Sequence, residues 1–328
     1  MTTHTKLLDG CGRAIEYLRL SVTDRCDLRC TYCIPPGFRD FVTPSHWLTF
    51  DEIEQVVGLL ARAGLKKVRL TGGEPLTRPG LGDLARRLRQ IPGIADLSLS
   101  TNGTRLAELA GTLRQAGIAR INVSLDTLDA GRFMKITGRD ALANVLNGLE
   151  TARDTGFSLV KINMVVMGGV NDDEVDAMVE YCAERGFILR LIETMPLGVA
   201  GSSVQHVNLQ PVKQRLQSRY GLIDGAVPGG GPAKYLVSPD GHLNVGFITP
   251  LSQHFCASCN RIRLSADGKL YTCLDGLASM DVGALIRSGA SEMELMSALT
   301  DALLSKPVRH DFGMSHSREN RVMAAIGG

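Results

Sequence analysis

The sequence predicts an α/β fold of parallel strands alternating with helices, followed by a smaller α+β region. Two observations support this. Short apolar runs of strand length alternate with helical patterns six times between residues 17 and 193. Beyond Pro196 this alternation stops and hairpin-like patterns replace it. Consecutive β/α units imply parallel strands with right-handed crossovers, in either an open doubly wound sheet or a partial barrel.

The six expected strands share short apolar runs and cover residues 17–23, 67–71, 96–100, 120–125, 159–166 and 188–192. The helices expected between them share a helical period and cover residues 50–63, 81–89, 106–116, 141–155 and 172–185. Polar motifs follow the strands at their carboxyl ends, where folds of this class place their sites.

The second region begins with a helix near residues 209–220 and a Pro/Gly-rich loop at 225–232. Two hairpins are expected next, pairing 235–238 with 243–247 and 261–265 with 270–272. Two helical stretches and a basic tail finish the chain. We therefore expect two domains, residues 1–196 and residues 197–328.

The composition is that of an ordinary globular protein. Of its 328 residues 44% are hydrophobic and 21% charged, and the net charge is +2. This balance predicts no nucleic-acid or membrane partner, so any anion site must be a local cluster of cations. No apolar run reaches transmembrane length, and residues 1–6 lack a secretory apolar region. We expect a cytoplasmic protein.

Cys26, Cys30 and Cys33 form a C-x3-C-x2-C triplet directly after the first expected strand. Three thiolates on a cubane of four irons leave one iron without a protein ligand, free to bind another molecule. A zinc site or a disulfide pair is the alternative. Zinc normally takes four ligands, and the Pro35-Pro36 pair that follows supplies no obvious fourth.

A second triplet, Cys256, Cys259 and Cys273, has the spacing C-x2-C-x13-C. It too is one ligand short, which predicts a second 4Fe-4S cluster with an open iron. A zinc ribbon with His254 or Cys182 as fourth ligand is the alternative. Grouped cysteines of this kind indicate metal binding in a reducing compartment rather than a disulfide framework.

Side chains within the strands predict a polyanion site. Lys161 in the fifth strand, Arg190 in the sixth and Arg19 in the first lie among apolar residues, so each is expected to point into the interior. Three cations converging from different strands suggest a polyphosphate substrate. After the second strand, consecutive glycines in residues 72–75 let backbone approach a ligand, and Glu74 can accept from an ammonium group.

The first triplet, Tyr32 and the Gly-Gly-Glu-Pro run closely resemble the radical S-adenosylmethionine (SAM) enzymes. That resemblance favours a six-unit partial barrel over an open sheet. It implies a 4Fe-4S cluster whose open iron chelates SAM and cleaves it to methionine and a 5'-deoxyadenosyl radical. With the second triplet, the Asn-Arg-Ile-Arg run at 260–263 and the terminal Gly327-Gly328, the chain resembles the GTP 3',8-cyclase family of molybdenum-cofactor biosynthesis over nearly its whole length.

This resemblance implies roles for individual residues. The SAM cluster would be on Cys26, Cys30 and Cys33, and the substrate cluster on Cys256, Cys259 and Cys273. The residues expected around SAM are Tyr32, Gly73, Glu74, Ser124 and Met195. Those expected to contact GTP are Arg19, Arg69, Thr101, Lys161, Arg190, Arg261 and Arg263. Gly327 and Gly328 would enter the barrel and organise Arg261 and Arg263 for catalysis. Asp27, Ile34 and Ala324 depart from the family pattern without touching a cluster ligand.

The implied reaction converts GTP to (8S)-3',8-cyclo-7,8-dihydroguanosine 5'-triphosphate, the first step of molybdopterin biosynthesis. Expected partners are an external one-electron donor and the next enzyme of the pathway, cyclic pyranopterin monophosphate synthase, and a homodimer is compatible with the pattern. The competing classes are a radical SAM enzyme acting on a peptide or haem precursor, and a non-enzymatic iron-sulfur redox protein. The redox protein leaves Lys161, Arg190 and the Gly-Gly tail without a role.

Overall fold

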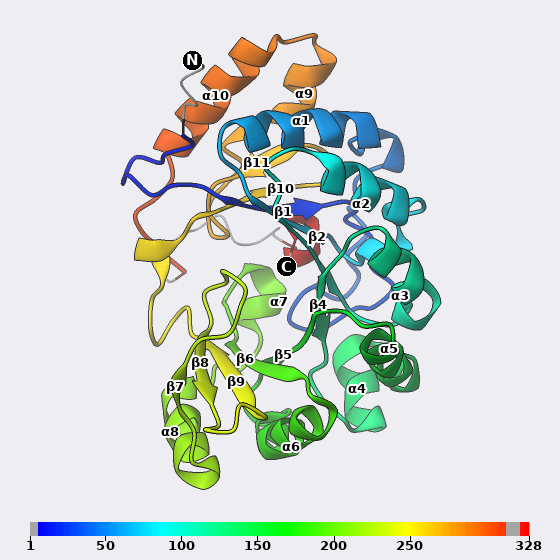
Figure 1. The fold of residues 1–328 in the computed structure, drawn as a ribbon, viewed down its shortest axis with the longest axis vertical. Helices are drawn as coiled ribbons and strands as arrows, with labels where there is room; N and C mark the ends of the chain where they lie inside the picture. Colours follow the sequence, from blue (N-terminus) through cyan, green and yellow to red (C-terminus); the bar gives the residue numbers. More distant parts are fainter. Residues whose placement is uncertain (1–5, 313–321, 328) are drawn as a thin grey trace.

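A computed structural model describes residues 6–312 and 322–327 of the chain. Its strands form one twelve-stranded sheet in the order β12-β11-β10-β1-β2-β3-β4-β5-β6-β9-β8-β7. From β10 through β1 to β6 and on to β9 all neighbours are parallel. Figure 1 shows the helices that follow the first strands on the outer side of this curved sheet, with the C-terminal residues on its inner side. The α/β class is confirmed.

The strands that position the site are β1 (Tyr17–Ser21), β2 (Lys67–Thr71), β3 (Asp96–Thr101), β4 (Arg120–Ser124), β5 (Leu159–Val166) and β6 (Ile188–Glu193). The remaining strands are β7 (Ile223–Gly225), β8 (Lys234–Val237), β9 (Asn244–Ile248), β10 (Arg261–Leu264), β11 (Lys269–Tyr271) and β12 (Met280–Asp281). The six strands expected in the first region are therefore all present, within two residues of their predicted ends.

The helices are α1 (Phe50–Arg62), α2 (Leu81–Gln90), α3 (Leu106–Gln115), α4 (Ala130–Thr137), α5 (Leu142–Asp154), α6 (Val175–Arg185), α7 (Gly198–Ser202), α8 (Leu209–Tyr220), α9 (Val282–Arg287) and α10 (Glu292–Leu304). Local side-chain contacts explain where α1 begins, because Thr49 and Glu52 form a capping box at its start. Within the described residues no helix is long and apolar enough to cross a membrane.

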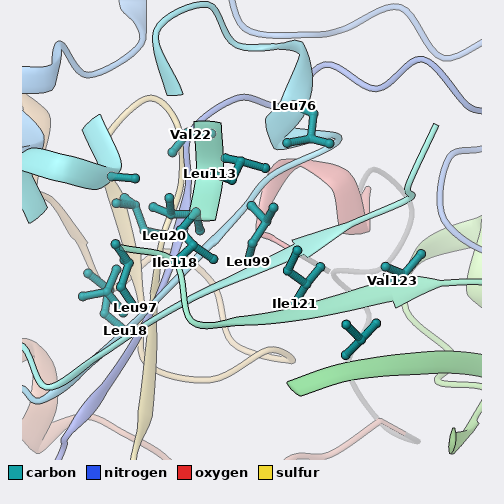
Figure 2. Packing of buried hydrophobic residues seen from close by; sticks show 14 of the residues in the cluster. Leu18, Leu20, Val22, Leu76, Leu97, Leu99, Leu113, Ile118, Ile121 and Val123 are labelled. Carbon is teal, nitrogen blue, oxygen red and sulfur yellow. The ribbon is translucent and has the colours of Figure 1, made fainter. Parts of the chain in front are cut away.

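Apolar side chains on the outer face of the sheet form the main core with the helices. Leu18, Leu20, Leu97, Leu99 and Ile121 are almost completely buried in it, and Figure 2 shows them packed together across neighbouring strands. Because side chains alternate along a strand, the residues between these apolar ones face the inside of the curved sheet. That alternation places Arg19, Ser98 and Asn122 on the inner face.

The second region extends both edges of the first. Strand β10 pairs in parallel with β1, and β9 pairs in parallel with β6. Both predicted hairpins are confirmed, β8 with β9 and β10 with β11. The sequence did not predict β7, β12 or helix α4, all of which are short. The division at residues 196 and 197 stays a prediction, since the sheet runs continuously through both regions.

Candidate active site

The first cysteine triplet lies on the loop that follows β1, held in place by the turn after β2. Cys30 O accepts from Cys33 N at 2.9 Å and from Ile34 N at 3.0 Å, which closes the loop into a tight turn. Gly73 N donates to Thr23 O at 2.9 Å. A Cβ added to Gly73 would lie 2.3 Å from Arg25 O, so only glycine lets the two loops approach this closely.

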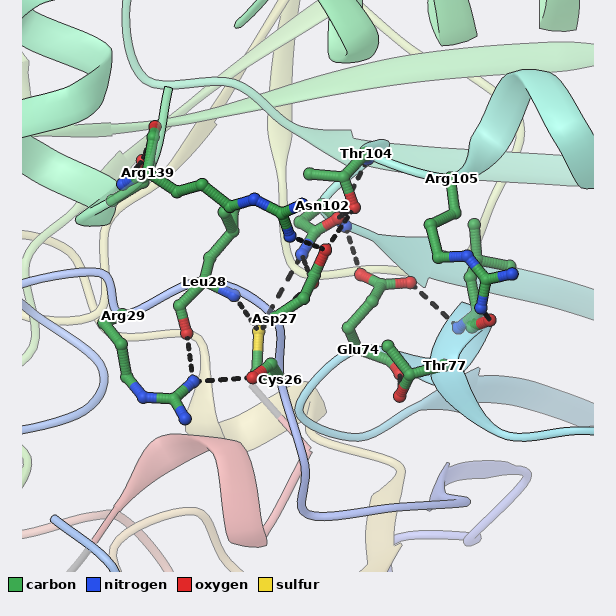
Figure 3. Close-up of polar contacts among 12 residues, drawn as sticks. Cys26, Asp27, Leu28, Arg29, Glu74, Thr77, Asn102, Thr104, Arg105 and Arg139 are labelled. Carbon is green, nitrogen blue, oxygen red and sulfur yellow. Dashed lines mark hydrogen bonds and ion pairs between the residues drawn. The ribbon is translucent and has the colours of Figure 1, made fainter. Parts of the chain in front are cut away.

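Polar side chains fasten the same loop to the ends of β3 and α4 (Figure 3). Asp27 accepts from Asn102 Nδ2 at 2.7 Å and from Thr104 Oγ1 at 2.7 Å, and it pairs with Arg139 at 3.4 Å. Asn102 Nδ2 also lies 3.8 Å from Cys26 Sγ. Asp27 Oδ1 lies 4.0 Å from Cys26 Sγ, so the expectation that Asp27 touches no predicted cluster ligand is wrong, and the charge of Asp27 is matched here by Arg139.

Glu74 is completely buried and links the ends of β2 and β3. Its carboxylate accepts from Leu76 N at 2.9 Å, Thr101 Oγ1 at 2.7 Å and Asn102 N at 2.6 Å. Burial raises the pKa of Glu74 to about 7 despite these bonds. The carboxylate does not line the cavity beside the cysteines, whereas Thr101 does. The predicted contacts of Glu74 with SAM and of Thr101 with GTP stay predictions.

The surroundings of the first triplet are acidic, and its cysteines are partly buried. Burial raises the pKa of Cys26 and of Cys33 to about 12, and Glu74 adds to the rise at Cys26. Tyr32 Oη donates to Asp126 Oδ2 at 2.7 Å, and burial raises the pKa of Asp126 to about 6. Thiolates held here therefore need a positively charged partner, which a metal cluster supplies.

The positions of the possible ligand atoms bear on the zinc alternative at the second triplet. Zinc–sulfur bonds of about 2.3 Å keep the sulfur ligands of one ion within about 4.6 Å of one another. Among the described residues, only His254, Cys256 and His310 bring three possible ligand atoms within 4.8 Å. Cys256 is the one cysteine of the two triplets in this group, among the described residues, and Cys259 and Cys273 lie outside it. The zinc ribbon built on His254 and all three cysteines of the second triplet is not formed.

The second triplet lies among cations. Cys256 and Cys259 flank the turn before β10, and Cys273 follows β11. Burial raises the pKa of Cys259, but Arg261 and Lys306 outweigh it and the net pKa is lowered. Lys306 Nζ donates to Arg261 O at 3.0 Å, which places its charge beside this triplet. The thiolate of Cys259 is thus stabilised before any metal binds.

Strand register brings the predicted cations together on the inner face. Arg19 is opposite Arg263 on one side and Arg69 on the other. Asn122 is opposite Lys161, and Asn163 is opposite Arg190. Lys67 and Arg120 were not predicted here, although each lies two residues from an inward-facing side chain on its strand, and this period of two marks them as members of the same face.

Lys161 and Arg190 are buried and form no ion pair among the described residues, whereas the neighbouring Arg120 pairs with Asp96. Lys161 and Arg190 are each 5% exposed. Burial and the neighbouring Arg190 and Arg120 lower the pKa of Lys161 to about 7, and burial lowers that of Arg190 to about 10. Buried Nε atoms of Arg69 and Arg190 have no hydrogen-bond partner among the described residues. A polyanion would supply the missing acceptors.

Three cavities follow one another along the inner face. The first, 180 Å³, is lined by the first triplet, Tyr32, Gly73, Ser124 and Met195. The second, 190 Å³, shares Met195 and Asn163 with it and is lined by the second triplet, Arg261 and Arg263. The third, 410 Å³, shares Arg69 and Arg190 with the second and adds Lys161, Arg120 and the glycines of the β7–β8 loop. With the exception of Glu74, the predicted SAM and substrate residues therefore line one continuous row of cavities.

The end of the chain returns to the middle of this row. Val322 and Ile326 are buried, and Gly327 O accepts from Arg263 and, at 3.2 Å, from Arg19 Nε. A Cβ added to Gly327 would lie 2.7 Å from Ser21 Oγ, so a larger residue does not fit. The expected proximity of the tail to Arg263 is present for Gly327, while Gly328 lies outside the described residues. The catalytic role of both stays a prediction.

Sequence comparison identifies the family. Residues 20–182 match the Radical SAM superfamily and residues 187–312 match Molybdenum Cofactor Synthesis C. The GTP 3',8-cyclase of Erythrobacter litoralis is 44% identical, with 99% of each chain covered. GTP 3',8-cyclase 1 of Pseudomonas aeruginosa is 44% identical, with 94% of each chain covered. The chain belongs to the GTP 3',8-cyclase family. Membership of the radical SAM superfamily makes SAM and iron-sulfur clusters its cofactors, as the sequence predicted.

Solved structures show the same fold. The crystal structure of Streptococcus suis SuiB bound to precursor peptide SuiA has a TM-score of 0.61 at 14% identity, covering 91% of this chain and 67% of that chain. SuiB bound to S-adenosylmethionine has a TM-score of 0.60 at 14% identity, with 92% and 67% covered. At this identity the likeness shows the fold alone, so the GTP 3',8-cyclase assignment depends on the sequence relatives.

Proposed function

We propose that this chain cyclises GTP to (8S)-3',8-cyclo-7,8-dihydroguanosine 5'-triphosphate, with the two substrates in adjacent cavities. The observation that carries the proposal is the row of cations in the third cavity, Arg69, Lys161 and Arg190, which are buried or half-buried and form no ion pair among the described residues. Such a row is costly without a polyanion, which makes a nucleoside triphosphate the fitting occupant. A peptide or haem precursor has no polyphosphate to satisfy it.

The triphosphate would occupy the cavity lined by Arg69, Arg120, Lys161 and Arg190. The guanine would then extend into the neighbouring cavity toward Cys256, Cys259 and Cys273, which would hold the substrate cluster. Arg261 and Arg263 line this second cavity. Gly327 O fixes the guanidinium of Arg263, and the tail thereby sets the direction in which that side chain meets the substrate.

SAM would occupy the cavity beside Cys26, Cys30 and Cys33, where those three residues would hold the first cluster. Bound there, that cluster supplies the electron that cleaves SAM to methionine and a 5'-deoxyadenosyl radical. Met195 and Asn163 line both this cavity and the next, so they adjoin both substrates. The protein's part is to hold SAM and GTP in register and to exclude water and other hydrogen donors.

The wider assignments follow from the family. An external one-electron donor serves the first cluster, and cyclic pyranopterin monophosphate synthase takes the product. A cytoplasmic location suits six grouped cysteines that must stay reduced. We also propose that the chain forms a homodimer and that its two domains divide at residue 196.

The direct test is anaerobic reconstitution with iron, sulfide, SAM, dithionite and GTP, followed by mass analysis of the nucleotide. We expect a cyclised GTP isomer and 5'-deoxyadenosine in proportion. Formation of 5'-deoxyadenosine with GTP left unchanged would contradict the substrate assignment.

The polyphosphate assignment has its own test, the binding of GTP and guanosine to wild type, Lys161→Ala and Arg190→Ala by calorimetry. A charge-assisted hydrogen bond contributes roughly 1.5 to 3 kcal/mol, so each variant should bind GTP about ten- to a hundredfold more weakly. Guanosine should bind poorly to all three proteins. Equal affinity of wild type for guanosine and GTP would disprove this assignment.

A further inference from the structure

A cationic hollow opens on the outside of the loop that carries the first triplet. Its volume is 830 Å³. We call the following lining residues the docking surface: Arg25, Arg29, Arg39, Lys135, Phe38 and Phe41. All four cations are exposed. Since the net charge of the whole chain is only +2, this is a local concentration of positive charge.

The cations of the docking surface are poorly neutralised. Among the described residues, Arg29, Arg39 and Lys135 form no ion pair, and Arg25 reaches only the buried Asp24, at 4.0 Å. The neighbouring Asp27 is already paired with Arg139. Asp40 is the one exposed carboxylate within the loop itself. The surface therefore presents an excess of positive charge to an incoming partner.

Aromatic rings give the surface a fixed shape. The guanidinium carbons of Arg25 and Arg29 lie 5.1 Å and 5.4 Å from the centre of the Phe41 ring. Phe38 packs edge-on against Phe41 with ring centres 5.0 Å apart. Arg29 also donates to the carbonyls of Cys26, at 2.6 Å, and Leu28, at 2.8 Å (Figure 3). Cations held in this way are ready for a partner without further ordering.

The docking surface is directly connected to the cluster ligands. Arg25 precedes Cys26, Arg29 precedes Cys30, and Ile34 in the floor of the hollow follows Cys33. Consecutive Cα atoms are about 3.8 Å apart. A molecule that contacts Arg25, Arg29 and Ile34 is therefore one residue along the chain from each of the three cysteines. Phe38 and Ile34 also share an apolar cluster with Cys26 and Cys33.

We propose that an acidic one-electron carrier protein docks on this surface and reduces the first cluster. The inference rests on the proposed function only in requiring an external electron at Cys26, Cys30 and Cys33. In the step one electron leaves the carrier and one enters the cluster, with no proton or group transferred. Charge complementarity steers the encounter, and the short path through the loop allows the transfer.

Binding to cluster-free protein tests the surface independently of activity. The probe is a purified acidic flavodoxin, titrated by calorimetry at ionic strengths of about 0.01 M and 0.15 M, where the Debye length falls from about 30 Å to about 8 Å. Arg39→Glu/Lys135→Glu should weaken binding by about tenfold or more at the lower ionic strength. The affinity of the wild type for flavodoxin should fall as the salt concentration is raised. The affinity of the variant should fall much less.

The matched control is Arg89→Glu/Arg114→Glu. Both residues are exposed and bond only to backbone carbonyls, of Ile94 at 3.0 Å and Gly156 at 3.1 Å. They end α2 and α3, at the opposite edge of the sheet from the cysteine loop. This variant has the same net charge as the first and should bind flavodoxin like wild type. Equal weakening in both variants, or wild-type binding that ignores salt, would overturn the proposal.

Electron delivery is then followed as 5'-deoxyadenosine formed from SAM. Reduced flavodoxin should drive this reaction about tenfold more slowly in Arg39→Glu/Lys135→Glu at low salt, while dithionite drives it as in wild type. A matching loss with dithionite would mean a damaged cluster loop and would overturn the docking assignment. Because the readout does not involve GTP, a failure of GTP cyclisation remains distinguishable. Tighter binding to anionic phospholipid vesicles than to flavodoxin would assign the surface to a membrane instead.

Discussion

The two ends of the interior have opposite electrostatic character. Around the first triplet, buried Glu74 and Asp126 have raised pKa values of about 7 and about 6, and the thiols of Cys26 and Cys33 are raised to about 12. Around the second triplet, cations lower the pKa of Cys259. One fold therefore holds an acidic pocket suited to a cationic ligand next to a basic pocket suited to an anionic one. SAM carries a sulfonium and an ammonium, and GTP carries a triphosphate, so each end matches one substrate.

The opposite character of the two ends predicts different functions for the two triplets. The largest expected effects come from replacing one cysteine of each triplet in separate variants. Cys30→Ser should abolish reductive SAM cleavage. Cys259→Ser should retain part of the cleavage and lose cyclisation, because its end of the interior serves the substrate. The measurement is 5'-deoxyadenosine and cyclised GTP from the same reaction. Normal GTP cyclisation by Cys259→Ser would contradict the prediction that the two triplets have different functions.

The second-largest expected effect is a difference in thiol reactivity between the two triplets. In cluster-free protein at mildly alkaline pH, Cys259 should react with iodoacetamide about a hundredfold faster than Cys26 or Cys33, because each unit of pKa changes the thiolate fraction about tenfold. Mass spectrometry of timed samples measures this. Arg261→Gln is the control: it should slow Cys259 and leave Cys26 unchanged. Equal labelling of the two ends would refute the electrostatic contrast.

Removing Gly327 and Gly328 should affect only the basic end. Arg263 and Arg19 lose the carbonyl of Gly327, a charge-assisted bond of roughly 1.5 to 3 kcal/mol, so cyclisation should fall about ten- to a hundredfold. SAM cleavage and both clusters should survive, since the first triplet keeps its own contacts. The ratio of cyclised GTP to 5'-deoxyadenosine reports the effect, and an unchanged ratio would show that the tail has no catalytic part.

The smallest expected effect is a pH dependence of GTP affinity. The pKa of Lys161 is lowered to about 7 in the free protein, and a bound triphosphate should raise it. Its contribution to affinity is therefore complete below pH 7 and is lost as pH rises through the bound-state pKa, by at most about tenfold per pH unit. Calorimetry in buffers of different ionisation enthalpy should show proton uptake on binding. Lys161→Arg should bind without that uptake, and uptake that persists in it must come from another group.

The tertiary structure shows contacts of two residues that the sequence did not indicate. Thr101, expected at GTP, lines the cavity of the first triplet and donates to Glu74. Glu193, fully buried at the end of β6, accepts from the amides of Leu251 and Ser252, at 3.1 Å each, and ties the second region to the first. No motif marked Glu193, because Leu251 and Ser252 lie more than fifty residues away and meet it only after folding.

The sequence by itself determined the order of strands and helices, the two cysteine triplets and the family. Those properties depend on local periodicity and on residue spacings short enough to be read along the chain. Only the tertiary structure decided that β10 joins β1 and β9 joins β6, since strand pairing across such separations leaves no local pattern. The same pairing set Arg19 opposite Arg263 and brought Gly327 O to both guanidinium groups. The contrast between an acidic and a basic end likewise arises from burial and proximity in space, which a nearly neutral sequence does not display.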